Sequence, residues 1–244
     1  MSGNVLLEVE GLSKHFGGVQ AVRDLSFQVR EGEILGVIGP NGSGKTTTFH
    51  LITGFHRPDR GHVQFKGEEI TGLPPYAVCV RGLCRTFQVA KPFPDISVHR
   101  NVLMGALLRR PAPADAGRRA DEVLHRVGLE TRADMTAGSL TTIDQRRLEV
   151  ARALATEPRL LLLDETMAGL NATEVGEAIK LISTLRERGL TVIVVEHVMR
   201  AVMSLSDRII VLDQGAQIAE GAPKDVVENP RVIEAYLGKE YRRA

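Results

Sequence analysis

Short runs of Val, Ile and Leu alternate along much of the chain with patterns that are typical of helices. Almost continuously apolar runs, as expected for strands buried on both faces of a parallel sheet, occupy residues 34–38, 160–163 and 191–195. Residues 5–9 and 25–29 instead alternate between apolar and polar positions, which is typical of half-buried antiparallel strands. The pattern predicts an α/β protein with a mainly parallel core sheet and an antiparallel β subdomain.

The same reasoning predicts further elements in the core. They are a helix at residues 46–52, a strand at residues 62–65, and a hairpin of strands at residues 208–212 and 216–220. Asn171 is a favourable helix cap, so a helix is expected to run from it to about residue 187.

The middle of the chain has a different character, because strand patterns vanish between about residues 97 and 156. Ser97 is a suitable cap for a helix through residue 108. A break is predicted at residues 109–117, which contain two prolines, with further helices at residues 120–127 and 145–155. We interpret this part as a helical subdomain inserted into the core. The predicted division is residues 1–88 (first part of the core with the β subdomain), 89–156 (helical subdomain) and 157–244 (second part of the core with C-terminal helices).

The composition is that of an ordinary folded protein, since 43% of the 244 residues are hydrophobic and 25% are charged. A formal net charge of +1 gives no reason to expect a nucleic-acid partner. The two cysteines, Cys79 and Cys84, are too few for a disulfide scaffold and indicate a reduced, cytosolic compartment. The apolar runs are too short to cross a bilayer and no targeting pattern is seen, so a role in transport would need another chain to form the channel.

The strongest chemical signal is an octapeptide of the form G-x-x-x-x-G-K-[ST] between a predicted strand and a predicted helix. It consists of Gly39, Pro40, Asn41, Gly42, Ser43, Gly44, Lys45 and Thr46, and Thr47 follows it. The glycines allow backbone N–H groups to approach phosphates, and the N-terminus of the helix adds favourable partial charge. Lys45 is expected to reach the β- and γ-phosphates of a nucleotide, and the Thr46 hydroxyl is expected to ligate Mg²⁺.

Four more polar residues complete the predicted site. Asp164 and Glu165 follow an apolar strand and are expected at the carboxyl edge of the sheet, where open α/β sheets bind ligands. Asp164 would hold Mg²⁺, and Glu165 would polarise the water that attacks the γ-phosphate. Gln88, just before the helical insertion, would ligate Mg²⁺ or water, and His197 would hydrogen-bond the γ-phosphate. A lone Gln or His is usually structural, so these two roles depend on their order relative to the other motifs.

The order of P-loop, Gln88, helical insertion, acid pair and His197 resembles that of ATP-binding-cassette (ABC) ATPases over nearly the whole chain. The resemblance implies a P-loop NTPase fold with a RecA-like core, and ATP and Mg²⁺ as cofactors. It also implies a head-to-tail dimer in which each ATP lies between one P-loop and the partner's signature loop. Phe16 matches the aromatic residue that stacks on adenine, although a core Phe ending the first strand is the alternative. Residues 168–171 match the loop that touches the opposed subunit.

A narrower resemblance links the chain to the branched-chain amino-acid uptake group. It is carried by residues 16–22, 164–171, 195–199, 218–221 and 229–238. It implies a peripheral importer ATPase on the cytoplasmic face of the inner membrane, with branched-chain or other hydrophobic amino acids or related small organic acids as cargo. The partners would be transmembrane permease subunits, which Gln88 and residues 89–102 would face, and indirectly a periplasmic or extracellular substrate-binding protein.

The signature loop departs from the family pattern Leu-Ser-Gly-Gly-Gln. The matching residues are Leu140, Thr141, Thr142, Ile143, Asp144 and Gln145. Both glycines are missing, and the Cβ of Ile143 restricts the backbone and its approach to the opposed γ-phosphate. The partner ATPase is therefore expected to be a non-identical subunit with a glycine-bearing signature. Thr166 also replaces the usual proline after Glu165, which is a milder change.

Other functions stay open at this point. An ATP-binding regulatory subunit with weak hydrolysis is suggested by the altered signature loop. A soluble ABC ATPase of DNA repair or translation is disfavoured, because such proteins usually carry two cassettes or a long insertion and a basic surplus is absent here. A P-loop kinase or GTPase is disfavoured more strongly, because it would leave Gln88, His197 and the inserted helices without a role.

Overall fold

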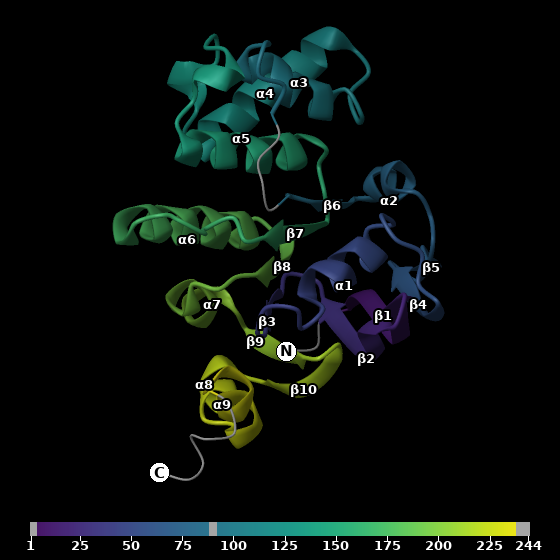
Figure 1. Cartoon of the computed structure of the whole chain (residues 1–244). Helices are drawn as coiled ribbons and strands as arrows, with labels where there is room; N and C mark the ends of the chain where they lie inside the picture. The colour runs from purple at the N-terminus through teal and green to yellow at the C-terminus, as the bar shows by residue number, and fades with distance from the viewer. Residues whose placement is uncertain (1–3, 88–91, 238–244) are drawn as a thin grey trace.

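The computed structural model describes residues 4–87 and 92–237, which form two β-sheets and a layer of helices (Figure 1). Within these residues the large sheet has the strand order β10-β9-β3-β8-β7-β6 and the small sheet the order β2-β1-β4-β5. The strands of the large sheet are β3 (Ile34–Ile38), β6 (Leu83–Arg85), β7 (Leu160–Asp164), β8 (Thr191–Val195), β9 (Arg208–Asp213) and β10 (Ala216–Gly221). Those of the small sheet are β1 (Val5–Phe16), β2 (Val19–Arg30), β4 (Arg60–Phe65) and β5 (Glu68–Glu69).

The large sheet is parallel except for β10, which pairs antiparallel with β9. Every residue of β3, β7 and β8 is buried, as their almost continuously apolar sequences predict. The predicted hairpin at residues 208–220 is also confirmed. Its turn places Gln214 and Gly215 at φ 46° and 81°, the left-handed conformation that tight hairpin turns require.

The small sheet is the predicted antiparallel subdomain. Leu7 lies opposite Val29 and Val9 opposite Phe27, so the two segments expected from their alternating pattern are partners. Both strands run longer than expected, because the buried positions continue at Leu12 of β1 and Val22 of β2.

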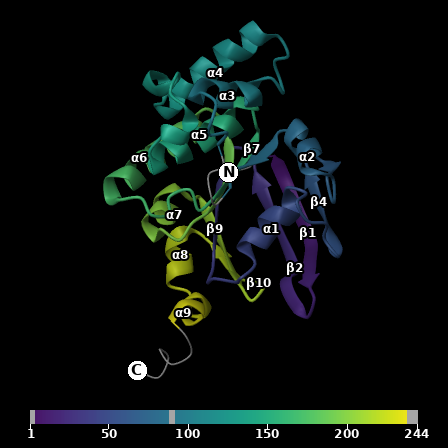
Figure 2. The same ribbon diagram turned by 45° about the horizontal axis from the view of Figure 1, so that its top comes forward.

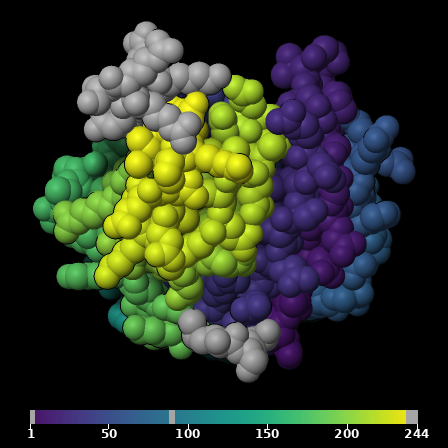
Figure 3. All heavy atoms as spheres, turned by 90° about the horizontal axis from the view of Figure 1, so that it is seen from below, coloured from purple at the N-terminus to yellow at the C-terminus, as the bar shows by residue number. Residues whose placement is uncertain are grey.

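Helices cover both faces of the large sheet (Figures 1 and 2). Those of the core are α1 (Lys45–Ile52), α2 (Pro75–Arg81), α6 (Ala172–Glu187), α7 (Met199–Leu205), α8 (Pro223–Val227) and α9 (Pro230–Leu237). Alternate residues of β7 face opposite sides of the sheet and belong to two hydrophobic cores. Leu161 and Leu163 belong to the core that α5, α6 and α7 help to form, and Leu160 and Leu162 belong to the core that α1 and the small sheet help to form. The C-terminal helices lie against the β9–β10 hairpin (Figure 3), where Val226 and Val232 are buried.

The helical layer consists of α3 (Val98–Ala106), α4 (Pro113–Val127) and α5 (Thr142–Ala155), with two short 3₁₀ turns, η1 (Glu130–Arg132) and η2 (Ala137–Ser139). Ser97 caps α3 as predicted, since its hydroxyl accepts the N–H of Arg100 at 3.1 Å. Helices α3 and α5 approach closely at Gly105, where a Cβ atom would lie 2.6 Å from the carbonyl oxygen of Arg152.

The structure corrects several predicted boundaries. Helix α4 begins at Pro113, inside the break predicted at residues 109–117, because proline is well tolerated at the first helical position. Elements α2, β6 and α7 were not predicted, since each is at most seven residues long and has no clear periodicity. No helix in the described part of the chain is long and apolar enough to cross a bilayer.

Candidate active site

A cleft of about 820 Å³ opens at the carboxyl ends of β3, β7 and β8. Its walls come from five separate parts of the sequence. They are residues 19–21, residues 41–47, Glu165, His197 and Gln214. The structure therefore brings the octapeptide, the second acid and the histidine to one place, at the sheet edge where open α/β proteins bind ligands.

The conformation of the P-loop requires glycine at two places. A Cβ atom on Gly39 would lie 2.1 Å from the carbonyl oxygen of Leu212, and one on Gly44 would lie 2.4 Å from that of Ala21. Both glycines also have positive φ values, 154° and 103°. The loop is therefore fixed between the β9–β10 hairpin and β2, and its backbone lies along the cleft.

Lys45 opens helix α1, and its side chain is almost fully buried beneath the loop. The ammonium donates to the carbonyl oxygens of Gly39 at 2.8 Å and Pro40 at 2.9 Å. Burial lowers the pKa of Lys45, while the nearby carboxylates of Glu165 and Asp164 act to raise it. A cation and the N-terminus of α1 thus face the same end of the cleft, an arrangement that favours an anion there.

Asp164 ends β7 and is completely buried. Its Oδ2 lies 3.0 Å from the guanidinium Nη2 of Arg85, and its backbone N–H donates to the hydroxyl of Thr86. Burial raises the pKa of Asp164, while Arg85 and Lys45 act to lower it. The other oxygen, Oδ1, is buried and has no hydrogen-bond partner among the described residues. An acidic oxygen of this kind, together with the Thr46 hydroxyl, fits the hard oxygen ligands that Mg²⁺ prefers.

Glu165 has the left-handed backbone conformation, with φ 50°, which is rare for a residue other than glycine. Two hydrogen bonds hold the backbone of Glu165. Its N–H donates to the Val195 carbonyl oxygen at 2.9 Å, and the guanidinium of Arg146 donates to the Glu165 carbonyl oxygen at 2.9 Å. The carboxylate then lies in the cleft, with Oε1 2.8 Å from Nε2 of His197. This pairing of a carboxylate with an oriented imidazole is suited to positioning a water molecule.

Sequence analysis missed the buried carboxyl group of Glu196. Its Oε1 accepts the backbone N–H of Met167 at 2.7 Å and the hydroxyl of Thr166 at 3.4 Å, so it fixes the turn that follows Glu165. Burial raises the pKa of Glu196. The signal in the sequence is an acidic residue directly after the apolar strand β8, beside His197. The hydroxyl of Thr166 thus makes a contact that the proline usual in the family does not offer.

Arg85 is the second residue that sequence analysis missed. Its guanidinium carbon lies 5.4 Å from the ring centre of Phe55 and 5.0 Å from that of Phe87, and it contacts both rings in addition to Asp164. Both partners of the ion pair are buried, with exposed side-chain fractions of 5% and 0%. Arg85 thus connects the site to aromatic side chains that line a groove on another face.

Replacing Arg85 by leucine is expected to lower the free energy of unfolding by about 3–5 kcal/mol, because it leaves the Asp164 carboxylate buried without its counter-charge. Urea unfolding at pH 7, followed by circular dichroism, measures the loss. Arg81→Leu is the matched control, since Arg81 is partly exposed and pairs with an exposed Glu68 at 3.5 Å. Its effect should stay within about 1 kcal/mol. Equal losses in the two variants would show that Asp164 does not depend on Arg85.

Two predicted site residues, Gln88 and Phe16, are not among the described residues that line the cleft. Gln88 falls in the gap between residues 87 and 92, so its role stays a prediction. Phe16 ends β1 and is 43% exposed, and its ring is in edge-to-face contact with that of His56, with 5.2 Å between ring centres. It does not line the cleft, but its register partner Val19 does. The prediction that Phe16 stacks on adenine is compatible with this position and stays a prediction.

The signature loop is an internally bonded helix start. Thr141 caps α5, because its hydroxyl accepts the N–H of Asp144 at 3.3 Å and donates to the Asp144 carboxylate at 2.7 Å. The Arg132 guanidinium pairs with the same carboxylate at 2.9 Å. The side-chain amide of Gln145 donates to the Leu140 carbonyl oxygen. The loop therefore presents the N-terminus of an intact α5 without the usual glycines.

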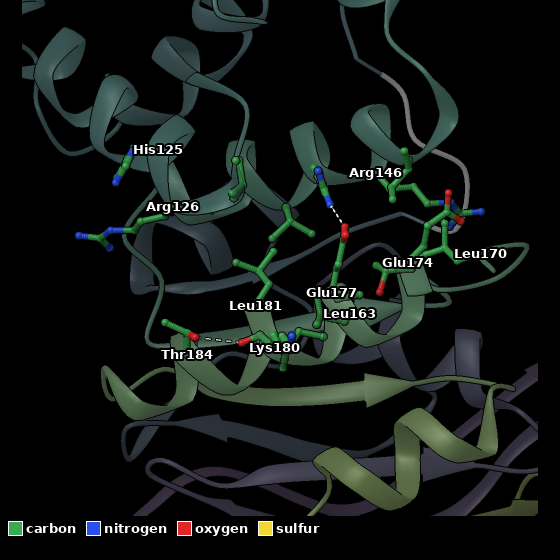
Figure 4. A pocket seen from close by; sticks show the side chains of 18 residues that line it. His125, Arg126, Arg146, Leu163, Leu170, Glu174, Glu177, Lys180, Leu181 and Thr184 are labelled. Atoms are coloured by element: carbon green, nitrogen blue, oxygen red, sulfur yellow. Dashed lines mark hydrogen bonds and ion pairs between the residues drawn. The ribbon is translucent and has the colours of Figure 1, made fainter. Parts of the chain in front are cut away.

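Ile143 lines a hollow of about 520 Å³ between the helical layer and α6 (Figure 4). Leu163, Leu170 and Leu181 also line this hollow, and an ion pair of Arg147 with Glu177 joins α5 to α6 beside it. The isoleucine side chain is thus accommodated within its own subunit.

The fold and the site together define a P-loop ATPase with an inserted helical subdomain. The model of the ABC transporter family matches residues 22–168, and the chain belongs to this family: it is the ATP-binding subunit that hydrolyses ATP to drive transport. A second family model, the branched-chain amino acid ATP-binding cassette transporter, matches residues 216–242.

Curated relatives agree with this assignment. The chain is 42% identical to the high-affinity branched-chain amino acid transport ATP-binding protein BraF of Pseudomonas aeruginosa, with 96% of this chain and 98% of the relative covered. It is 37% identical to the lipopolysaccharide export system ATP-binding protein LptB of Acidithiobacillus ferridurans, with coverage of 97% and 98%. Among solved structures, the ADP conformation of MJ1267, an ATP-binding cassette of an ABC transporter, is similar with a TM-score of 0.88 and 30% identity, covering 97% of this chain and 100% of that one.

Proposed function

We propose that the chain drives an importer of branched-chain amino acids or related hydrophobic solutes. The observation that carries the proposal is the C-terminal match at residues 216–242, because this segment distinguishes the branched-chain group from ATP-binding cassettes in general. The branched-chain amino acid transport functions of relatives at 42% identity support the same cargo. The 37% identity to an export-system ATPase leaves lipopolysaccharide-type export as the second candidate cargo class.

Purification of the native complex tests the cargo. The importer proposal predicts that two permease proteins and a second, non-identical ATPase co-purify with the tagged chain. It also predicts loss of radiolabelled leucine uptake when the chain is deleted. Unchanged uptake of branched-chain amino acids, or recovery with outer-envelope export proteins, would contradict it.

The proposed chemistry assigns a role to each residue of the cleft. Lys45 balances the charge of the β- and γ-phosphates, and the P-loop N–H groups hold them. Thr46, Asp164 and Gln88 would hold Mg²⁺, which supplies charge neutralisation at the phosphates when bound. Glu165 accepts a hydrogen bond from the attacking water, and His197 holds the Glu165 carboxylate in place at 2.8 Å.

A groove of about 440 Å³ that Phe87 lines is the proposed docking site for a permease helix at the cytoplasmic face of the membrane. It lies between α2 and the helical layer. Its apolar lining includes the exposed side chains of Phe55, Tyr76, Phe87, Phe93 and Met104. An exposed apolar surface of this kind marks an interaction site. In this proposal residues 89–156 form the signature subdomain, between two core segments at 1–88 and 157–244, and a substrate-binding protein contacts the permeases on the other side.

The working dimer is proposed to contain a non-identical ATPase partner. Thr142 and Ile143 begin α5 where the family has glycines, so the ATP of an opposed subunit would meet a poor clamp. The P-loop of this chain is complete and would meet the partner's glycine-bearing loop. One lost backbone clamp on developing charge corresponds to about 3 kcal/mol, or roughly a hundredfold in rate.

The purified chain alone is therefore expected to hydrolyse ATP slowly. Its activity should rise roughly a hundredfold with the non-identical partner, and should also rise when Thr142 and Ile143 are both changed to glycine. Steady-state phosphate release measures both effects. Brisk hydrolysis by the lone chain, unaffected by the double change, would remove the basis of the heterodimer. Slow hydrolysis even in the full complex would favour the alternative function, a regulatory ATP-binding subunit.

A further inference from the structure

The chain has two cysteines, and the fold places them side by side. Cys79 lies in the last turn of α2 and Cys84 in β6, with 3.0 Å between their Sγ atoms. The chain reverses direction between them at Gly82, whose φ of 100° ends the helix. The hydroxyl of Thr156, at the end of α5, lies 3.0 Å from Sγ of Cys84.

The two thiols differ in accessibility and in acidity. Both cysteines line the groove, where Cys79 is half-buried and Cys84 is buried. A hydrogen bond from the Cys84 thiol stabilises the Cys79 thiolate and lowers the pKa of Cys79 to about 7. The same contact, together with burial, raises the pKa of Cys84. A partly accessible, acidic thiol next to a second thiol is the arrangement found in redox-sensing cysteines.

We propose that Cys79 and Cys84 form a reversible redox site, with Cys79 as the thiol that reacts with a peroxide and Cys84 as the resolving thiol. Cys79 takes the first role because it is the more exposed of the two thiols in the groove. Metal binding explains the pair less well, because no group of three or more His, Cys, Asp or Glu ligands occurs in residues 4–87 and 92–237.

The chemistry takes two balanced steps. The Cys79 thiolate attacks one oxygen of hydrogen peroxide, the O–O bond breaks, and the departing hydroxide takes up the proton that Cys79 released, which gives a sulfenic acid and water. The sulfur of Cys84 then attacks the sulfur of Cys79, the S–O bond breaks, and the hydroxide leaves as water with the proton of Cys84. Two thiols have lost two electrons and two protons, and a dithiol reductant returns them.

Formation of the disulfide is expected to change the surface of the groove. The Sγ–Sγ distance must fall from 3.0 Å to about 2.05 Å, which draws the end of α2 towards β6. Tyr76 lies one turn earlier on the same helix and lines the groove. Oxidation is therefore expected to weaken permease docking, a consequence that rests on the proposed function, whereas formation of the bridge does not.

Mass spectrometry of the reduced, purified chain after treatment with hydrogen peroxide tests the site. We expect an intact mass lower by two hydrogen atoms and a fall from two titratable thiols to none, reversed by dithiothreitol. Cys84→Ser should instead accumulate a sulfenic acid at Cys79 that dimedone traps, and Cys79→Ser should keep its thiol. Two thiols that survive an excess of peroxide would overturn the proposal, as would disulfides formed only between chains.

Binding of the reduced and oxidised chain to the detergent-solubilised permeases tests the consequence. We expect the oxidised chain to bind at least tenfold more weakly, with recovery after reduction, and the Cys79→Ser chain to be insensitive to peroxide. Equal binding by both forms would overturn the effect on docking while leaving the redox site intact. No binding by the reduced chain would contradict the proposed function instead, and the thiol measurements would be unaffected.

Discussion

Changing Glu165 to glutamine is expected to preserve ATP binding and to slow hydrolysis by roughly 10²–10⁴-fold. The amide keeps the size of the side chain and can still hydrogen-bond to His197, whose Nε2 lies 2.8 Å from Oε1 of Glu165 in the parental structure. It removes the charge that orients and polarises the attacking water. Single-turnover phosphate release in the assembled complex measures the chemical step, and binding of a fluorescent ATP analogue measures affinity. Gel filtration with ATP and Mg²⁺ should also show a longer-lived dimer.

The matched control is Glu187→Gln, an exposed carboxylate at the end of α6 that does not line the cleft. It should hydrolyse ATP at the parental rate. Glu165→Gln with parental turnover would mean that Glu165 is not the residue that activates water. A large loss of affinity in this variant would instead show that Glu165 mainly shapes the nucleotide site.

Changing Lys45 to alanine is expected to abolish measurable hydrolysis and to weaken ATP binding by roughly 10- to 150-fold. The estimate corresponds to one charge-assisted contact of about 1.5–3 kcal/mol. The buried ammonium now donates to the Gly39 and Pro40 carbonyl oxygens, so the variant also loses contacts that order the loop. Isothermal titration with ATP and Mg²⁺ measures the affinity, and thermal unfolding shows whether the loop remains folded.

Lys224→Ala provides the control, because Lys224 is exposed on α8. It should bind and hydrolyse ATP normally. Parental ATPase activity in Lys45→Ala would contradict the P-loop assignment, on which every other proposed role depends.

The sequence predicts the buried strands well and the small elements poorly. Strands β3 and β8 match their predicted limits because four of the five residues in each are strongly apolar, which favours a strand buried on both faces. Strand β6 was missed because its three residues, Leu-Cys-Arg, have no period to detect. It is a strand because it pairs with β7, a contact between residues almost 80 positions apart in the chain.

The site is predictable where chemistry follows directly from a motif. Lys45, Glu165 and His197 all line the cleft, as expected from their positions after β3, β7 and β8. Arg85 and Glu196 could not be assigned, because a charged residue beside a strand is usually solvated. Only the fold shows that both are buried, with Arg85 paired to Asp164 and Glu196 bonded to the backbone of Met167, just after the acid pair.

Strand order in the large sheet also has a consequence for synthesis on the ribosome. The P-loop strand β3 is complete at Ile38, yet its two neighbours are β8 and β9, and β9 ends at Asp213. The pairing of β1 with β2 is local and can form early, whereas β3 must wait with both edges unpaired while most of the chain is made. The Leu212 carbonyl oxygen that packs against Gly39 arrives last. A nascent chain therefore acquires its nucleotide site only near the end of translation, and an incomplete chain has none.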